Sequence, residues 1–362
     1  MMIPLSQPVM KKHIENLKNF SGFNNFEDDD RLITHYIKIK DYVRDKNQPC
    51  MYHRFNFYSK IIEKKEDKDN GLNLSFINCG HGDSCLIEHK GKYVLIDFGG
   101  KADAVKSFLD THLKHQKIEY AICSHFHTDH MTDYETIFKN YDVENFVFVK
   151  NINTKISMGS FKEIMKLEFC NATHLHMLEI GDCLETHSHN FSIGDLSFEI
   201  LGPTYDFENL NDNSIVVKLS YKDNTVLFTG DISENSERQL MNYCKVNDID
   251  LGTNILKVAH HGSKSATCIE FLQKAKPDTA IICCSEKNKY YHPDYQTVHR
   301  LEEVCPNVLQ TSNFESAINI CITPDGKILQ EKEIPEFSDV KQIVTIHPIL
   351  MTALETEGDY IH

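Results

Sequence analysis

Hydrophobic and polar positions alternate from residue 72 onward, as expected of half-buried β-strands. Leu72, Leu74 and Phe76 are apolar at every second position, and a Lys90-Gly91-Lys92 turn separates two further apolar runs. By the same criteria, strands are predicted at 86–88, 93–96, 119–124, 146–149, 191–193, 196–201, 215–221, 225–228, 255–259, 279–283, 317–322 and 327–331. Helical spacing of apolar residues predicts helices at 101–114, 134–140, 233–244, 268–274 and 296–304.

Strands and helices alternate in this region, but several strand pairs are joined by short turns and are predicted to form hairpins. A single doubly wound parallel sheet would need a helix between most successive strands. Two sheets with helices on their outer faces therefore explain the pattern better. We expect one α/β domain over residues 71–330.

The first 70 residues show a different pattern. Apolar positions at helical spacing occur at 11–20, 31–45 and 52–65, and the charged run 63–70 ends at Gly71. The sequence therefore predicts a helical N-terminal extension, 1–70, and a C-terminal tail, 331–362, with one short helix near 344–355.

Composition excludes several classes of protein. Of the 362 residues, 41% are hydrophobic and 25% are charged, which excludes a wholly disordered chain. No segment approaches the roughly 18 consecutive apolar residues of a membrane helix, and the N-terminus lacks the apolar run of a secretory signal. The 12 cysteines form no CxxC pair, so we expect reduced thiols, a cytoplasmic location and no membrane association.

Four side chains of metal-ligand type fall within six positions, directly after the predicted strand 119–124: His125, His127, Asp129 and His130. A loop leaving a strand end can turn the first two imidazoles toward one point, and Asp129 and His130 toward a neighbouring point. Imidazole and carboxylate together suit Zn, Mn or Fe. A chance cluster in a chain with 20 His is the alternative, but spacing and strand context favour a metal site.

The spacing H-F-H-T-D-H at 125–130 resembles the HxHxDH motif of metallo-β-lactamase-fold hydrolases. Three more segments resemble that family in the same order: V-L-I-D-F-G-G at 94–100, V-L-F-T-G-D at 226–231 and I-L-K-V-A-H-H-G-S at 255–263. The resemblance implies an αββα sandwich, carrying the helical extension as an addition.

Within that family, N-C-G-H-G-D-S at 78–84 resembles the D-V-G-Q-G-D-S signature of the hydrolase domain of competence-type DNA-uptake proteins (ComEC) and their stand-alone relatives. The segments N-D-N-S at 211–214, H-H-G-S-K-S at 260–265 and N-K-Y-Y-H-P at 288–293 match the same branch. The resemblance covers residues 72–325.

The resemblance implies two divalent metal ions, with Zn or Mn expected. His125 and His127 would bind the first, Asp129 and His130 the second, and Asp231 would bridge them, with a bridging hydroxide as nucleophile. Asp129 and His292 would be catalytic, His292 by contacting the leaving group, although a buried structural histidine is an alternative for it. The residues that would contact the substrate or support the ligands from behind are Asp83, Asp97, Asn213, Ser214, His261 and Asn288.

The last histidine ligand requires a choice between His260 and His261. If the strand 255–259 continues, alternation places Leu256, Val258 and His260 on the apolar inner face and His261 on the other. We therefore expect His260 to be the ligand and His261 to contact the substrate or support the ligands, although alternation often fails at strand ends.

The chain departs from the family pattern at three positions. Most two-metal members carry another histidine shortly before the Gly-Asp strand, where this chain has Asn211-Asp212-Asn213-Ser214. The first metal would then have fewer protein ligands. Asn78 and His81 replace the Asp and Gln of the branch signature, which would alter metal choice or substrate without removing the main ligands.

A second group of histidines lies at 174, 176, 187 and 189. The two H-x-H pairs suggest a distant metal site, but no Asp or Cys of matching spacing accompanies them. We interpret them as surface or loop residues.

The expected reaction is hydrolysis, and the branch favours a phosphodiesterase or nuclease. The net charge of the predicted hydrolase domain and tail argues against a nucleic-acid substrate. Residues 71–362 hold 25 Lys and Arg and 42 Asp and Glu, a balance of −17, whereas residues 1–70 carry +2. Either the extension contacts nucleic acid, through basic residues such as Lys38, Lys40, Arg44 and Lys46, or the substrate is a nucleotide or another small phosphodiester. The alternatives are a carboxylic-ester or lactone hydrolase, and a degenerate binding module in a larger complex that docks a protein partner through residues 1–70.

Overall fold

The computed structural model describes residues 71–113, 117–149, 173–178 and 189–331, and the structural statements below concern these residues. The predicted N-terminal extension, 1–70, and the tail beyond residue 331 lie outside them, as does His187.

The first sheet has eight strands in the order β15-β14-β1-β2-β3-β4-β5-β6. The neighbours from β3 to β6 run parallel, and the other neighbours are antiparallel. The strands are β1 (Leu72–Ile77), β2 (Ser84–His89), β3 (Lys92–Phe98), β4 (Lys117–Cys123), β5 (Asp142–Val149), β6 (His174–Leu178), β14 (Ala317–Ile322) and β15 (Ile328–Glu331).

The second sheet has seven strands in the order β13-β12-β11-β10-β9-β8-β7. Here β7 to β10 form antiparallel neighbours, and β10 to β13 run parallel. The strands are β7 (Phe191–Ile193), β8 (Leu196–Gly202), β9 (Val216–Tyr221), β10 (Asn224–Phe228), β11 (Ile255–Lys257), β12 (Thr279–Ile282) and β13 (Asn307–Gln310).

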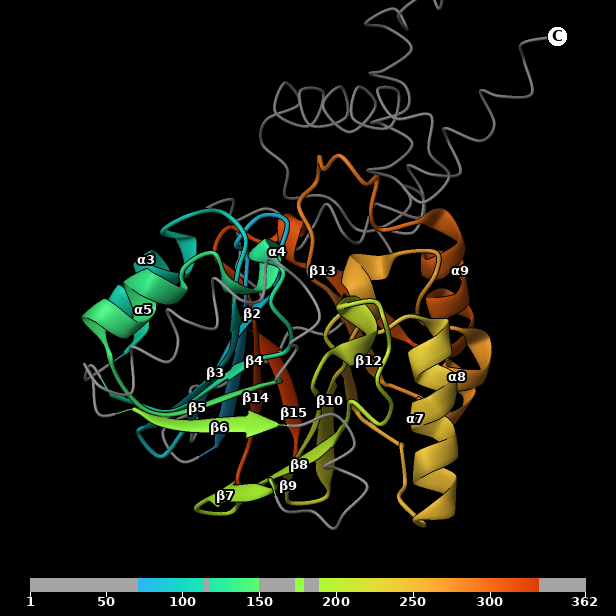
Figure 1. Cartoon of the computed structure of the whole chain (residues 1–362), viewed down its shortest axis with the longest axis horizontal. Helices are drawn as coiled ribbons and strands as arrows, with labels where there is room; N and C mark the ends of the chain where they lie inside the picture. Colours follow the sequence, from blue (N-terminus) through green and yellow to red (C-terminus); the bar gives the residue numbers. More distant parts are fainter. Residues whose placement is uncertain (1–70, 114–116, 150–172, 179–188, 332–362) are drawn as a thin grey trace, which may run out of the picture. The chain divides into compact units, whose positions relative to one another are not determined.

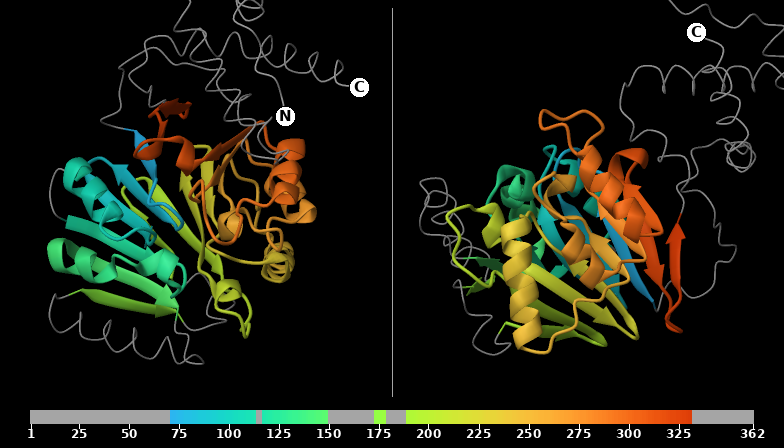
Figure 2. Two further views of the ribbon diagram at one scale, coloured as in Figure 1. Left: turned by 90° about the horizontal axis from the view of Figure 1, so that it is seen from above. Right: turned by 90° about the vertical axis from the view of Figure 1, so that its right-hand side faces the viewer.

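The two sheets pack face to face, with helices on both outer sides (Figures 1 and 2). Helices α3 (Ala104–His112) and α5 (Tyr134–Asn140) cover the first sheet, and α7 (Glu234–Val246), α8 (Ile269–Ala275) and α9 (Tyr295–Val304) cover the second. Each helix turns apolar residues inward, such as Phe108 of α3 and Phe271 of α8. The αββα sandwich expected from the sequence is confirmed.

Among the described strands and α-helices, three were not predicted: β6, β13 and the short helix α4 (Thr128–Met131). The 174–189 histidines were interpreted as surface or loop residues, and two of them are not in a loop, because His174 and His176 lie in β6 and pair with β5. His174 is exposed, whereas His176 Nε2 lies 2.8 Å from Asn145 Oδ1. Alternating histidines on an edge strand give little apolar signal, which explains the omission.

The parallel strands of both sheets end at the same side of the sandwich, where α4 and the loop after β12 lie in Figure 1. Functional loops gather at the carboxyl ends of such strands. The predicted site segments follow β3, β4, β10, β11 and β12, so the fold brings them together.

Two observations bear on the expectations from composition. Among the described residues, no helix is both long and apolar enough to cross a bilayer. The described cysteines are all buried and unpaired by disulfides.

Candidate metal centre

The segment with the HxHxDH motif leaves the end of β4 and is held from behind by Asp97, at the end of β3. The Asp97 carboxylate accepts hydrogen bonds from Ser124 N at 2.7 Å and Ser124 Oγ at 2.8 Å. It also accepts one from His130 Nδ1 at 2.9 Å. Asp97 is buried, so these bonds fix both the backbone of the loop and the ring of His130. The Nε2 atom of His130 is thereby left as the free ligand atom.

Backbone contacts join this loop to the glycine-rich segment before β2. Asp83 N donates to Asp129 O at 3.0 Å, and Gly99 N donates to Asp83 O at 3.1 Å. A Cβ atom at Gly99 would overlap the carbonyl of Asp129. Only glycine permits this approach, which places the Asp83 side chain beside the HxHxDH loop.

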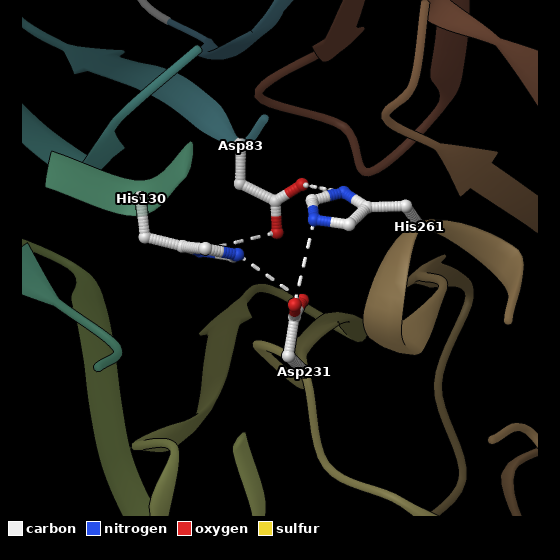
Figure 3. Close-up of side chains that lie close together, drawn as sticks. All are labelled: Asp83, His130, Asp231 and His261. Atoms are coloured by element: carbon white, nitrogen blue, oxygen red, sulfur yellow. Dashed lines mark ion pairs between the residues drawn. The ribbon is translucent and has the colours of Figure 1, made fainter. Parts of the chain in front are cut away.

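Four buried side chains from four segments converge in what we call the inner cluster: Asp83, His130, Asp231 and His261 (Figure 3). Asp231 is central, with Oδ1 3.2 Å from His130 Nε2 and Oδ2 3.4 Å from His261 Nε2. Asp83 closes the other side, with Oδ1 3.3 Å from His261 Nδ1. The ligand atoms of all four lie within 4.8 Å of one another.

The inner cluster contains His261, whereas the sequence favoured His260. Strand β11 ends at Lys257, and both histidines adopt left-handed backbone conformations, with φ of 50° and 53°. The assumption of continued strand alternation is therefore wrong here. The ring of His261 is buried, while His260 is 25% exposed, with Nε2 3.9 Å from Asp231 and 3.3 Å from Asn211 Nδ2.

The inner cluster fits a divalent cation. His130 Nε2, His261 Nε2, Asp231 Oδ1 and Asp83 Oδ1 are buried and have no hydrogen-bond partner. Buried polar atoms without partners are costly, so four of them around one point favour an occupant that satisfies them together. Imidazole and carboxylate are the donors that Zn and Mn accept. His261 Nδ1 lies 2.8 Å from the Cys283 carbonyl, which orients this ring as Asp97 orients His130.

Asp129 and His81 form a second group around the same His261 atom. Asp129 Oδ2 lies 3.4 Å from His261 Nε2 and 4.0 Å from His81 Nε2. Asp129 is 25% exposed, so this group faces the open side of the site. His81 stands where the branch signature has Gln, and the sequence alone did not make it a site residue.

His125 and His127 form a pair beside the inner cluster, which we call the histidine pair. His125 Nε2 lies 3.0 Å from His127 Nδ1, and the rings of His125 and His130 are 4.2 Å apart. Ser214 Oγ accepts from Asp231 N at 3.0 Å and lies 3.3 Å from His125 Nδ1. Among the described residues, the pair joins no group of three or more His, Cys, Asp or Glu donors. This agrees with the missing third histidine of the Asn211–Ser214 segment.

Lys257 is a buried cation that sequence reasoning missed. Its Nζ contacts Asp83 Oδ2, donates to Gly230 O at 3.0 Å and lies 3.8 Å from Asp231 Oδ1. Burial opposes its charge, but Asp83 and Asp231 outweigh burial and raise its pKa. A lysine inside the apolar strand 255–259 was the available signal, because a buried charge needs a partner.

The same electrostatics govern the ligands. Burial opposes protonation of His130, but the carboxylates of Asp231, Asp97 and Asp83 outweigh it and raise its pKa to about 10. Burial would raise the pKa of Asp231, but His130 and His261 hold it well below its usual range. Without metal, positive charge on the imidazoles thus balances the carboxylates, and a bound cation would replace that charge.

Two of the predicted site residues, Asn213 and Asn288, make hydrogen bonds within their own loops. Asn213 exchanges hydrogen bonds with the backbone of Phe207, at 2.9 and 2.8 Å. Asn288 donates to Ser285 O and His292 O and accepts from Tyr290 N and His292 N. Both amides are therefore occupied by the loops, which they hold in shape. His292 lies nearer the site, with its ring 5.7 Å from that of His260 and its buried Nδ1 without a partner.

Comparison with known proteins identifies the class. The model of the metallo-beta-lactamase superfamily matches residues 77–155 and 184–286, just over half of the 362 residues. The chain belongs to the metallo-beta-lactamase superfamily. The prediction of a metal-dependent hydrolase is confirmed at that level.

Within this class, the relatives support the resemblance to competence-type proteins. The chain is 27% identical to ComE operon protein 3 of Bacillus subtilis over 259 residues, which are 66% of this chain and 31% of that protein. It is 28% identical to Recombination protein 2 of Haemophilus influenzae over 234 residues, 62% of this chain and 26% of that protein. The chain thus spans less than a third of the length of either relative. Among solved structures, it is similar to the metallo-beta-lactamase fold protein YhfI from Bacillus subtilis, with a TM-score of 0.45, 12% identity, and coverage of 72% of this chain and 100% of that one.

Proposed function

We propose that this chain is a two-metal phosphodiesterase that acts on nucleic acid or a nucleotide. The observation that carries the proposal is the convergence of four unpartnered donors in the inner cluster, directly beside the histidine pair. The name of one relative, which refers to recombination, supports DNA as the class of substrate.

The proposed ligands follow from the contacts. The inner cluster, joined by Asp129 from the open side, would hold one metal and the histidine pair the other, with Asp231 between them. This assignment replaces His260 by His261, since His261 Nε2 lies 3.4 Å from both Asp129 and Asp231, whereas His260 Nε2 lies 3.9 Å from Asp231. Metal ions bound here would acidify a water molecule and polarise a phosphoryl oxygen.

The charge of the site supports an anionic substrate. Asp83, Asp97, Asp129 and Asp231, with Lys257 as the one buried lysine in contact, leave three negative charges when all are ionised. Two divalent cations would convert this to one positive charge, whereas a single cation would leave it negative. A phosphodiester would then be attracted only after both cations are bound.

The remaining residues of the site position the metal ligands or contact the substrate. Ser214 links the backbone of Asp231 to His125, so it fixes the spacing between the two metal positions. His260 and His292 are only partly buried and flank the open side, where they would donate hydrogen bonds to substrate oxygens. This retains the expected role of His292 at the leaving group.

The test compares bis-p-nitrophenyl phosphate with p-nitrophenyl acetate, in the presence of Mn²⁺ or Zn²⁺. The proposal expects phosphodiester hydrolysis by the wild-type chain and its loss in Asp129→Ala, with Asp195→Asn, a carboxylate paired with Lys90 on another part of the chain, as a control. Preference for the acetate would favour the carboxylic-ester alternative. Less than one tightly bound metal per chain, with no hydrolysis, would favour a binding module.

A further inference from the structure

The loop between β12 and α9 exposes aromatic side chains next to the metal centre. Tyr290 is 51% exposed and Tyr291 is 80% exposed. Of the five large hydrophobic side chains exposed among the described residues, these two lie in this loop. Figure 1 shows this loop, in orange, at the same end of the fold as α4. Exposed aromatics concentrated beside a site indicate a contact surface.

The loop is held in shape, which distinguishes it from a loosely attached surface loop. The side chain of Asn288 makes four hydrogen bonds to its backbone, including Tyr290 N at 3.2 Å and His292 O at 2.7 Å. Asp294 N donates to Gly262 O at 2.8 Å, which ties the loop to the segment carrying His261. The tyrosine rings are therefore presented at low entropic cost.

Tyr290 lies close to the proposed metal ligands, with the ring of His81 between them. Its ring lies 5.2 Å from the ring of His81, whose Nε2 is 4.0 Å from Asp129. It is also stacked on the ring of His292, at 5.8 Å between centroids. A group placed on Tyr290 would thus be a short distance from anything bound at Asp129 and His261.

The loop also exposes lysines close to these rings, although Glu286 and Asp294 balance the charge of Lys287 and Lys289 within it. Lys289 Nζ lies 4.7 Å from the centroid of the Tyr290 ring. Lys264, Lys287 and Lys289 are exposed on this loop and on the one after His261, within a region of net charge −17. Aromatic rings interleaved with lysines are the features that bind single-stranded nucleic acid, by stacking on bases and pairing with phosphates.

Resting on the proposed function, we propose that Tyr290 and Tyr291 form a stacking subsite for the nucleobase next to the scissile phosphodiester. The base would take the place of the Lys289 ammonium over the ring of Tyr290, and Lys289 would turn to the adjacent phosphate. The substrate is then a nucleoside phosphodiester in a single strand or at a frayed end, because a paired base cannot stack on a protein ring. The identity of the base would matter little.

The test uses two esters that release the same p-nitrophenolate. Thymidine 5′-(p-nitrophenyl phosphate) carries a base, and methyl p-nitrophenyl phosphate does not. We expect wild-type kcat/KM to favour the thymidine ester, and Tyr290→Leu or the Tyr290→Leu/Tyr291→Leu double variant to reduce that preference by roughly 5- to 100-fold. Tyr290→Phe retains the ring and should retain the preference. Tyr295→Leu removes an exposed tyrosine that faces His299 instead, and serves as the matched control.

The outcomes separate the two proposals. Equal kcat/KM for both esters in the wild-type chain, or a preference that survives the double variant, overturns the stacking subsite and leaves the phosphodiesterase standing. If the wild-type chain hydrolyses neither ester with Mn²⁺ or Zn²⁺, the proposed function fails. Binding of thymidine 5′-monophosphate, measured by calorimetry, then tests the stacking subsite. Weaker binding by the double variant than by the wild-type chain supports the subsite, and equal binding overturns it.

Discussion

The inner cluster and the histidine pair lie side by side but are built differently. The inner cluster combines two carboxylates with two imidazoles. Asp97 orients the ring of His130 through its Nδ1 atom, and the Cys283 carbonyl orients the ring of His261 in the same way. The hydrogen-bonding neighbours of the histidine pair are neutral, chiefly Ser214 and the partner ring, and the ring of His130 lies 4.2 Å from that of His125.

The difference implies that the two proposed metal positions of the site need not be equivalent. Carboxylates bring charge to a cation, and oriented imidazoles bind without losing ring freedom. The inner cluster should therefore bind its metal more tightly, whereas the histidine pair depends on sharing Asp231. The predictions below test this ranking, beginning with the residue that both positions share.

Asp231→Asn should have the largest effect, because Asp231 contacts the Nε2 atoms of both imidazoles of the inner cluster and is anchored beside the histidine pair. We expect kcat/KM for the thymidine ester to fall by roughly 1000-fold or more. Elemental analysis should give two metal ions per wild-type chain and fewer than one in the variant. Asp195→Asn, in an exposed ion pair with Lys90, is the matched control. Two retained metals in Asp231→Asn would contradict the shared position.

His261→Ala and His260→Ala form a matched pair that tests the ligand choice. His261 is buried against Asp83, Asp129 and Asp231, so its loss should reduce metal affinity by roughly 100-fold or more, beyond the effect of an outer partner. His260→Ala should change metal affinity less than about fivefold, because its ring lies 3.9 Å from Asp231 and is partly exposed. Competition with a chelating dye measures both. The opposite order would restore the choice made from the sequence.

That choice shows where sequence reasoning succeeds and where it stops. The HxHxDH loop was predictable because one short segment carries four side chains of metal-ligand type directly after a strand, so local geometry brings them together. His260 and His261 depend on two left-handed residues after β11, which no apolar periodicity reveals. Asn288 matched a motif, but only the structure shows that its four hydrogen bonds serve the loop.

The fold follows the same division. Long or strongly alternating elements were predicted close to their bounds, such as α5 (Tyr134–Asn140) and β1 (Leu72–Ile77). Two of the missed elements are short, since β13 and α4 have four residues each. The similarly short β7 and β15 were predicted because glycine turns adjoin them, whereas a four-residue segment without such a turn carries almost no periodicity.

Asp97→Asn should have a smaller effect than loss of a ligand. The amide can still accept from Ser124 N, but it presents an N–H group to the Nδ1 of His130 and disturbs the ring orientation. A loss of roughly 10- to 100-fold in metal affinity at the inner position is expected, with the metal count recovered at high Mn²⁺. Failure to recover would mean that Asp97 maintains the fold of the loop rather than the ring of His130. Circular dichroism and the thermal midpoint of the variant provide that control.

The smallest effect on the site is expected from a substitution at a carboxylate that is buried elsewhere. Comparison with that carboxylate tests why the acids of the inner cluster have low pKa values. Glu237 of α7 accepts hydrogen bonds from Thr267 N and Cys268 N at the start of α8. No cation pairs with it in these contacts, and burial, opposed by those amides, raises its pKa to about 7. Asp83, which is equally buried, has its pKa lowered to about 2 because Lys257, His130 and His261 outweigh burial.

The pH dependence of stability follows from that contrast. Because the folded-state pKa of Glu237 lies above the value of 4.5 for a free glutamate side chain, the folded protein binds this proton more tightly than the unfolded chain does. Its contribution is complete below pH 4.5 and is lost as the pH rises through 7, which lowers the free energy of unfolding by about 2 kcal/mol between pH 5 and 7. Glu237→Gln should remove this slope in urea titrations at several pH values and leave metal content and hydrolysis unchanged. An unchanged slope in the variant would mean that another group titrates in this range, and a changed metal content would mean that the second sheet's helices and the inner cluster are coupled.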